Sequence, residues 1–349
     1  MTGPVRDPSL GTSAGIGRYF GVVSAVPTTL LTGYITLLLA SGAWTHRPDF
    51  SGAMKALTHV SLSEAIFLLA VTLLIALVLH TVQFGIIQFF EGYWGGNDLM
   101  RYLRTRRTQS HLIRLHNATR HLQDARKTRS ALESADKNHL IALLNEPDST
   151  KARAYLASEV AISEATDTHT GYPNDRRHVM PTRLGNILRR YEVSAGHPYD
   201  LDVLRQATHL ALVAPENHVN YLKDQRNALE LAVRLCASAL LASAATVILM
   251  LPWGLWLLLT LVPYTAAYIS YRGSLLAAHH YGNALITLVD LNRFRLYEAL
   301  HMPNPATTRI ERLRNAAMSR VAARSPTANI VYDHSKPSTP TPPTQPPGH

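Results

Sequence analysis

Cysteine is almost absent from this chain of 349 residues, because Cys236 is its only one. A single thiol excludes an intramolecular disulfide framework and a cysteine-rich zinc site. Charge is scarce as well: Asp, Glu, Lys and Arg make up 17% of the residues, against roughly 25% in a typical soluble protein. The composition therefore excludes a disordered chain and a collagen-like fibre. The uneven distribution of the charges also excludes an ordinary soluble globule.

Three long stretches contain no Asp, Glu, Lys or Arg at all, and they cover residues 19–46, 65–90 and 235–271. The first two suit one helix each, since crossing about 30 Å of hydrocarbon takes roughly 20 apolar residues. The third would measure about 55 Å as one helix, so Pro252-Trp253-Gly254 near its middle predicts a turn between two spans. The predicted fold class is all-α: an integral membrane protein with four transmembrane helices in two hairpins and a helical cytoplasmic insert.

Two other interpretations of these stretches are open. The small residues at 40–43 suit cleavage of a signal peptide, although the apolar core of a signal peptide usually has only about 7–15 residues. Buried helices of a large soluble core would also be free of charge, but three such long stretches in one chain favour a membrane.

Positive charge predicts which ends of the spans face the cytoplasm. Between Tyr93 and Asn227 there are 20 Lys and Arg residues, whereas the turn between the last two spans has none. Because cytoplasmic loops are enriched in Lys and Arg, both termini and the central segment are predicted to be cytoplasmic, with the chain in the plasma (inner) membrane. The net charge of +10 then needs no nucleic-acid partner, and membrane lipids are the expected partners.

The predicted organisation follows from these spans. Its parts are a cytoplasmic N-terminal tail (1–18), a first transmembrane hairpin (19–92), a cytoplasmic helical domain (93–228), a second transmembrane hairpin (229–271), cytoplasmic C-terminal helices (272–324) and a disordered Pro-rich tail (325–349).

Hydrophobic spacing and helix breakers predict the helices of the cytoplasmic domain. Thr182 is expected to cap one short helix and Asp200 another. The expected segments are helices over 93–145, 150–165, 182–191 and 201–213, and a loop over 166–181.

Two segments are specific enough to suggest relatives. One is Met-Pro-Thr-Arg-Leu-Gly-Asn over 180–186 with its continuation to Glu192, and the other runs from Tyr281 to Tyr297. The chain resembles a group of uncharacterised bacterial integral membrane proteins, common in actinobacteria, that carry a PTRLGN motif between two transmembrane hairpins. The resemblance implies the topology given above and no known activity. The group is expected to have Gly where this chain has Asp200, and a Trp-Pro-Arg-like run near His209 that this chain lacks.

The PTRLGN segment is also a candidate binding site for an anion or a partner. Its helix gathers polar and cationic side chains near an N-terminus, where free amides favour an anion, and Arg can hold a phosphate through two hydrogen bonds. The alternative is that these groups tie the loop to neighbouring helices. The candidate residues are Thr182, Arg183, Asn186, Arg189 and Arg190.

Polar residues in the second span form the other candidate site. His80, Gln83 and Gln88 lie within the second charge-free stretch, and polar side chains in a span usually face the bundle interior or a water-filled path. They are candidates for lining a pore. The alternative is hydrogen bonding between helices.

No catalytic constellation is found. Gly11-Thr12-Ser13-Ala14-Gly15 matches G-x-S-x-G, but that motif works only between a strand and a helix. The 17 histidines have no metal-ligand spacing. The sequence therefore predicts no catalytic residue, metal or cofactor, and a non-enzymatic scaffold or signalling component with a partner- or anion-binding cytoplasmic domain. The alternative function is a homo-oligomeric ion channel or pore.

Overall fold

The computed structural model describes residues 25–135, 150–325 and 329–334, and within them it contains helices and no strands. The all-α prediction is therefore confirmed for this part of the chain. The α-helices are α2 (Val26–Ala40), α3 (Phe50–Thr58), α4 (Leu62–Glu91), α5 (Asp98–Ala135), α7 (Thr150–Thr170), α8 (Arg183–Ser194), α9 (Val203–Val213), α10 (Glu216–Met250), α11 (Leu261–Ala299) and α12 (Thr308–Ala322). Between them lie the 3₁₀ segments η2 (Arg176–His178), η3 (His197–Tyr199) and η4 (Leu251–Thr260).

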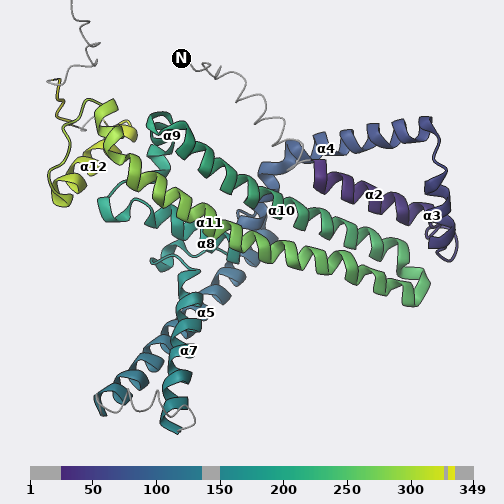
Figure 1. Ribbon diagram of the computed structural model, residues 1–349, viewed down its shortest axis with the longest axis horizontal. Helices are drawn as coiled ribbons and strands as arrows, with labels where there is room; N and C mark the ends of the chain where they lie inside the picture. Colours follow the sequence, from purple (N-terminus) through teal and green to yellow (C-terminus); the bar gives the residue numbers. More distant parts are fainter. Residues whose placement is uncertain (1–24, 136–149, 326–328, 335–349) are drawn as a thin grey trace, which may run out of the picture. The chain divides into compact units, whose positions relative to one another are not determined.

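The helices form two compact units. Figure 1 labels the helices and colours them by residue number. Unit 1 comprises the described residues up to Arg190 together with Lys223–Tyr281. Unit 2 comprises Tyr191–Leu222 and the described residues from Gly282 onward. The boundaries fall inside α8, α10 and α11, so these three helices contribute residues to both units.

In unit 1, the second helix of the first predicted hairpin, α4, is capped at both ends. α4 begins with a capping box, in which the Ser61 hydroxyl accepts from the amide of Glu64 and the Glu64 carboxylate accepts from the amide of Ser61. It ends at Gly92, whose φ of +98° is a left-handed conformation that favours glycine. α2 packs against α3 and α4, and the first six residues of the predicted first span lie outside the described residues.

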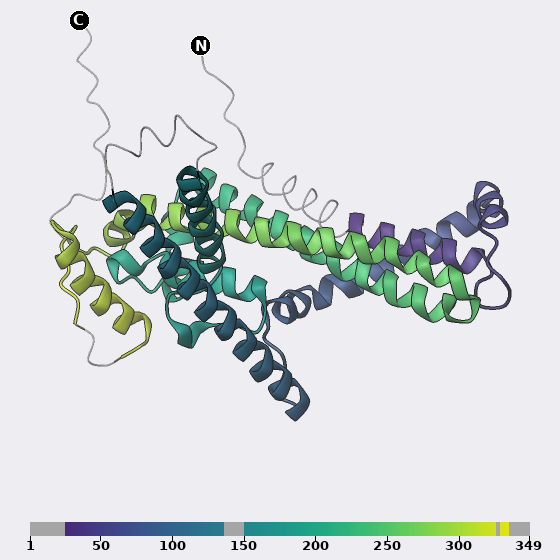
Figure 2. The ribbon, with the colours of Figure 1, turned by 90° about the horizontal axis from the view of Figure 1, so that it is seen from below.

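The second charge-free hairpin turns where Pro252-Trp253-Gly254 predicts it. The backbone leaves helical geometry at Trp253 and at Gly254, whose φ of +56° and ψ of −108° suit glycine alone. Figures 1 and 2 show α10 and α11 lying side by side on the two sides of this turn. The predicted break in the 37-residue stretch is therefore confirmed.

The ends of the two hairpins contact one another. The Trp253 indole nitrogen donates to the carbonyl of Ala43 at 2.5 Å, and the rings of Phe50 and Trp256 are 5.3 Å apart. Leu38 and Met250 are completely buried in the same cluster. The turn after α2 and the turn after α10 therefore lie at one end of unit 1.

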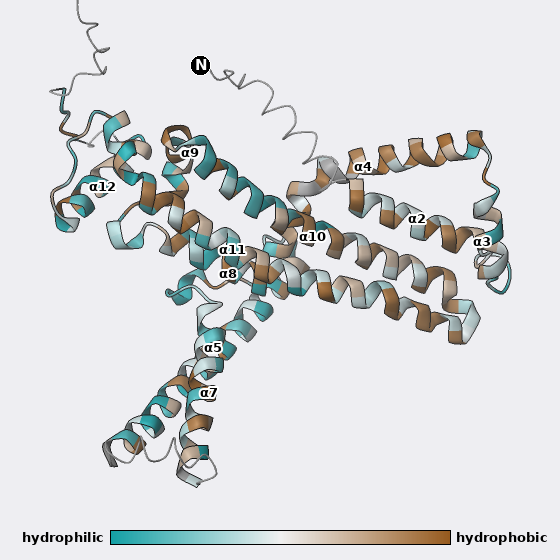
Figure 3. Ribbon diagram, in the orientation of Figure 1, coloured by the Kyte–Doolittle hydropathy of each residue, from teal (hydrophilic) through white to brown (hydrophobic). Residues whose placement is uncertain are grey.

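Length and apolarity single out one helical run among the described residues as able to cross a membrane. It extends over Glu216–Ala299, which is α10, η4 and α11 together, with a turn inside it. Val26–Ala40 and Leu62–Val78 are shorter apolar stretches. Figure 3 shows hydrophobic colour along α2, α4 and the parts of α10 and α11 next to the turn, whereas α5 is mostly hydrophilic.

Helices α5 and α7 form a paired arm, in which an ion pair between Arg129 and Glu159 joins the two helices at 2.8 Å. Helix over the predicted residues 150–165 is confirmed, and its predicted start coincides with the first described residue of this part of the chain. The predicted break at 145–149 lies outside the described residues.

Two predicted helix ends in this arm are wrong. α5 begins at Asp98 and not at 93, because Gly95 and Gly96 precede it and glycine is unfavourable within a helix. Residues 166–170 continue α7, which was expected to end at 165, because the first helix breaker is Gly171, followed by Pro173.

Unit 2 has its own hydrophobic core. Leu210 of α9, Val289 and Leu296 of α11, and Met318 of α12 are almost completely buried there. The N-terminal tail (1–18) and the last residues of the Pro-rich tail lie outside the described residues.

The predicted cap of α9 is corrected. Asp202 accepts from the amide of Arg205 at 3.2 Å, whereas Asp200 ends η3. Asp200 has a φ of +56°, and an N-cap residue needs extended backbone instead. The helix therefore begins at Val203, two residues after its predicted start.

Candidate functional site

The PTRLGN segment joins the start of α8 to the end of α4 in unit 1. The Thr182 hydroxyl accepts from the amide of Gly185 at 3.0 Å and donates to the carbonyl of Glu91 at 2.8 Å. The first bond is the predicted cap of α8, and the second satisfies a carbonyl at the C-terminus of α4 that has no partner within its own helix.

Close backbone contact explains the glycines at this joint. A Cβ on Gly185 would lie 1.9 Å from the carbonyl oxygen of Glu91, and one on Gly92 would lie 2.4 Å from Cγ of Pro181. Leu184 is completely buried beside them. The two helix ends therefore approach more closely than any residue with a side chain at position 185 would allow.

Asn186 holds the loop that precedes α8. Its side chain is completely buried. The amide oxygen accepts from the backbone nitrogen of Met180 at 2.7 Å, and the amide nitrogen donates to the carbonyls of Met180 and Thr182 at 2.9 and 2.7 Å. All of these partners are backbone groups, so Asn186 is a structural clamp on the segment 180–182.

The five residues predicted as an anion or partner site therefore differ in their surroundings. Thr182 and Asn186 form the backbone contacts described above, as the alternative interpretation expected. Arg183 is exposed, and Arg189 and Arg190 are half-buried and take part in interactions of their own. The arginines remain candidates for binding a ligand.

A buried histidine lies beside this segment, and the sequence did not single it out as a site residue. His111 of α5 is 7% exposed, and its Nδ1 lies 2.9 Å from the hydroxyl of Tyr172. Burial, followed by the positive charges of Arg114 and Arg107, lowers the pKa of His111 from 6.5 to about 4, and Arg183 adds to the effect. His111 is therefore neutral near pH 7, although cationic side chains surround it.

His279 of α11 has a similar environment. Burial lowers its pKa first, and the charges of Arg190 and Arg183 lower this pKa further. Arg183 thus acts on both histidines, which lie on different helices. The region around the start of α8 is strongly electropositive.

Comparison with models of known protein families, with curated proteins and with solved structures finds no match for this chain. The function must therefore be inferred from the residues themselves. Within the described ranges, no group of three or more His, Cys, Asp or Glu side chains is placed to hold a metal.

The predicted pore-lining residues all belong to α4. Gln88 is half-buried, and its carbonyl accepts from the amides of Gly92 and Tyr93 at the end of the helix. The side chains of His80 and Gln83 lie outside the description. Pore lining stays a prediction.

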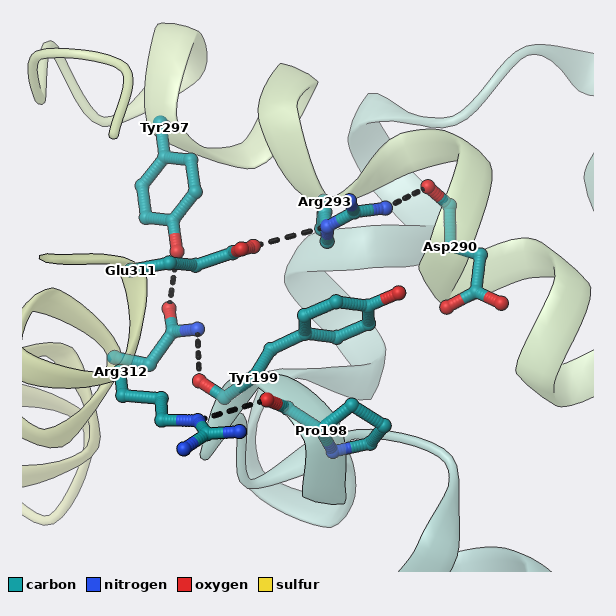
Figure 4. Close-up of polar contacts among 8 residues, drawn as sticks. Pro198, Tyr199, Asp290, Arg293, Tyr297, Glu311 and Arg312 are labelled. Atoms are coloured by element: carbon teal, nitrogen blue, oxygen red, sulfur yellow. Dashed lines mark hydrogen bonds and ion pairs between the residues drawn. The ribbon is translucent and has the colours of Figure 1, made fainter. Parts of the chain in front are cut away.

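Unit 2 contains a second polar cluster, which centres on Arg293 of α11 (Figure 4). Its Nε donates to the Glu311 carboxylate of α12 at 2.9 Å, and its Nη1 donates to the carbonyl of Asp290. The guanidinium carbon lies 4.1 Å from the ring centre of Tyr199 and 4.4 Å from that of Phe294. Glu311 is 4% exposed, so the carboxylate of this ion pair is buried.

A chain of hydrogen bonds extends the cluster to η3. The Tyr297 hydroxyl of α11 donates to the Asn315 side-chain oxygen of α12 at 2.5 Å. The Asn315 side-chain nitrogen in turn donates to the carbonyl of Tyr199 at 2.8 Å. Burial raises the pKa of Tyr297 and of Tyr199, so both phenols stay protonated near pH 7.

This second cluster fixes α12 against α11 and η3. Arg293 and Tyr297 lie within the segment from Tyr281 to Tyr297 that stands out in the sequence, although no spacing within it indicates their contacts. Nothing in the pattern of α12 pointed to Glu311 or Asn315, because each lies 18 positions from its partner beyond a proline-containing turn.

Proposed function

We propose that this chain is an integral membrane protein with four transmembrane helices in two hairpins and both termini in the cytoplasm. Its helical cytoplasmic domain acts as a non-enzymatic scaffold or signalling component that binds a partner. The proposal has two parts, insertion in the membrane and partner binding, and each part has its own support and its own test.

The observation that carries the proposal is the inverted distribution of side chains on α10. Between Leu235 and Leu249, the buried side chains of α10 are all small or hydroxylated and include Ser243 and Thr246, which are 7% and 0% exposed. Its exposed face carries large apolar side chains such as Leu241 and Ile248, which are 50% and 73% exposed. Small residues at helix contacts and large apolar residues outside are typical of helices that pack in lipid.

Contacts between the spans support the same interpretation. The hydroxyls of Tyr34 on α2 and Thr246 on α10 are 2.9 Å apart, which joins the two hairpins through a polar bond between otherwise apolar helices. On α4, Phe67 and Leu74 are both more than half exposed. Such a large exposed apolar surface is unfavourable in water and favourable in a bilayer.

The positions of the hairpin ends support the proposed orientation. The turns near Ala43 and Trp253 contact each other, so both hairpins can open toward the same side of a membrane. At the other end, α4 is followed within a few residues by the arginine-rich start of α5. Positively charged residues next to a span favour the cytoplasm.

Partner binding is assigned to the arm formed by α5 and α7. The arm is largely charged, yet Leu156 and Val160 lie one turn apart on α7 and are at least half exposed. An exposed apolar pair on a polar helix is suited to anchor another protein's helix or groove. The resemblance to PTRLGN-containing membrane proteins is consistent with this topology and adds no activity.

Membrane insertion and orientation are tested with reporter fusions in cells. A reporter that is active only in the cytoplasm, placed behind Asp148 or at the C-terminus, is expected to be active, and one placed in the turn at Gly254 is expected to be silent. The reverse pattern, or release of the protein by alkaline carbonate washing, would contradict the proposal.

Partner binding is tested with a photo-crosslinking amino acid at Leu156 or Val160, compared with the same amino acid at the exposed Lys127. A defined crosslinked species at the first two positions and not at the control supports a scaffold. Equal labelling at all three positions would contradict it. For the pore alternative, the expected observation is conductance in liposomes that changes with His80→Ala.

A further inference from the structure

The first part of α5 is unusually rich in arginine, and its one acid, Asp98 at the start of the helix, pairs with Arg101. From Leu99 to Gln123 there are six arginines and no Asp or Glu. The loop between α7 and α8 has one acid, Asp175, whose carboxylate accepts from Arg177 at 2.7 and 2.9 Å. The acids nearest in sequence therefore leave most of this positive charge uncompensated.

Three of the arginines converge on one place in unit 1. Leu115 of α5 packs with Tyr172 and Val179, and Nδ1 of His111 lies 2.9 Å from the Tyr172 hydroxyl, so this face of α5 contacts the segment that leads into α8. Arg107 and Arg114 lie one turn before and one turn after His111, and residues at these spacings share a helix face. Arg183 follows Pro181 by two positions and is the first residue of α8.

The three guanidinium groups are available to a ligand. Arg107, Arg114 and Arg183 are all exposed, and none of them has an ion-pair partner among the residues that the structure describes. All three carry enough charge near His111 to act on its ionisation. Like charges gathered without counter-charges repel one another, so a bound anion would stabilise this arrangement.

We infer that Arg107, Arg114 and Arg183 form a binding site for a phosphate-bearing anion beside the joint between α4 and α8. Guanidinium groups bind phosphate oxygens through paired hydrogen bonds. The donors are the arginine side chains, because the Thr182 hydroxyl already bonds to Gly185 and Glu91. The inference deepens the proposed function and rests on it for one ligand source, the headgroup of an anionic phospholipid.

The place of the site in the chain fits a lipid headgroup. The apolar helix α4 ends at Glu91, and the indole of Trp94 donates to the carbonyl of Phe89 just beyond it. Aromatic residues at a span end mark the level of the headgroups, and clusters of arginine directly after a span attract anionic lipids. A free phosphate offers the same chemistry without requiring the membrane.

The full-length protein, purified in a neutral detergent, distinguishes these sources. Binding is measured by native mass spectrometry and by thermal unfolding with short-chain phosphatidylglycerol, short-chain phosphatidylcholine and inorganic phosphate. Binding of phosphatidylglycerol in preference to phosphatidylcholine assigns the site to a lipid headgroup. Binding of inorganic phosphate alone assigns it to a soluble ligand. Failure of both anions to bind would overturn the inference.

Matched variants test the residues themselves. Each arginine is expected to contribute about fivefold in affinity, so R107Q/R114Q should weaken anion binding roughly twentyfold and R183Q about fivefold. The control R106Q/R120Q removes the same charge from exposed positions on the opposite side of α5 and should change binding little. R107K/R114K keeps the charge and should restore part of the affinity.

If R107Q/R114Q and the control R106Q/R120Q lose the same affinity for the anion, the effect comes from net charge alone, and the inferred site is wrong. The anion site and the membrane topology are contradicted by different results. A protein that inserts in the membrane but binds neither anion contradicts only this inference, whereas misplaced reporters contradict the topology and leave the phosphate measurement valid.

Discussion

The hydroxyl of Thr182 donates to the carbonyl of Glu91 across 91 positions of the chain, at a distance of 2.8 Å. This bond brings the C-terminus of α4 to the N-terminus of α8, where the partial charges of the two helix ends attract each other. The same threonine caps α8, so one side chain serves both helix ends. The PTRLGN segment is therefore explained first as a joint between helices.

Gly185→Ala is expected to destabilise this joint severely. The new Cβ would lie 1.9 Å from the Glu91 carbonyl oxygen, which is backbone and cannot move without separating α4 from α8. We expect a loss of roughly 3 kcal/mol or more in stability, measured as a lower melting temperature in detergent. Gly273→Ala is the matched control: this helical glycine has open space around it, so the substitution should be neutral or stabilising. Equal melting temperatures for the two variants would contradict the close contact.

Local signals in the sequence were sufficient for several features of the fold. Thr182 as a cap and the turn at Pro252-Trp253-Gly254 were predicted, because each depends on a few neighbouring residues. The contact of Gly185 with Glu91 could not be predicted, since nothing in a single sequence relates positions so far apart. The cap of α9 was assigned to Asp200 instead of Asp202, because two aspartates two positions apart give the same signal.

Asp200→Gly is expected to keep or raise the stability of the protein. Asp200 is exposed and adopts a left-handed backbone with a φ of +56°, a conformation that glycine adopts freely. Asp200→Ala should instead cost about 1 kcal/mol, because alanine gains nothing from its side chain in this conformation. A lower melting temperature for the glycine variant than for the alanine variant would contradict the assigned backbone.

His111 is expected to make the stability of the protein depend on pH. Its pKa is about 4 in the folded chain and 6.5 as an ordinary value. As the pH falls from about 6.5 to about 4, the unfolded chain binds a proton at this residue and the folded chain does not. The free energy of unfolding should therefore decrease over this interval by at most about 3 kcal/mol, and it should be unaffected by His111 above pH 7.

The difference between wild type and His111→Gln isolates this contribution, because all carboxylates are common to both proteins. Glutamine does not titrate, so the variant should lose less stability than wild type between about pH 6.5 and about pH 4 in denaturant unfolding. If the free energy of unfolding changes with pH in the same way for both proteins, His111 is not held neutral by its surroundings.

The polar cluster of unit 2 illustrates what a single sequence leaves open. Arginine, tyrosine and asparagine occur throughout this chain, and nothing in the sequence marks Arg293 or Asn315 as shielded from solvent. Their roles depend on how α12 returns to α11 after the segment containing Pro303 and Pro305. The hydrophobic spacing of each helix predicts that it exists, but the partner of its polar side chains depends on the tertiary fold.

Glu311→Gln is expected to loosen α12. The buried carboxylate accepts from Nε of Arg293, so its removal leaves a largely buried guanidinium without its counter-charge. Removal of one partner of a buried pair costs roughly 3 kcal/mol. The measurement is limited proteolysis with trypsin, which should cleave faster at arginines within α12 such as Arg309 and Arg312.

The exposed pair formed by Lys127 and Asp124 supplies the control, because its side chains are 80% and 74% exposed and 4.0 Å apart. Asp124→Asn should lower the free energy of unfolding by less than about 0.5 kcal/mol. It should leave the rate of tryptic cleavage in α12 unchanged. The double variant Arg293→Met/Glu311→Leu separates charge from packing, since it removes both charges together. It should be cleaved more slowly than Glu311→Gln, because no unpaired charge remains. If the double variant is cleaved faster, the aromatic packing of Arg293 against Tyr199, and not its charge, holds α12 in place.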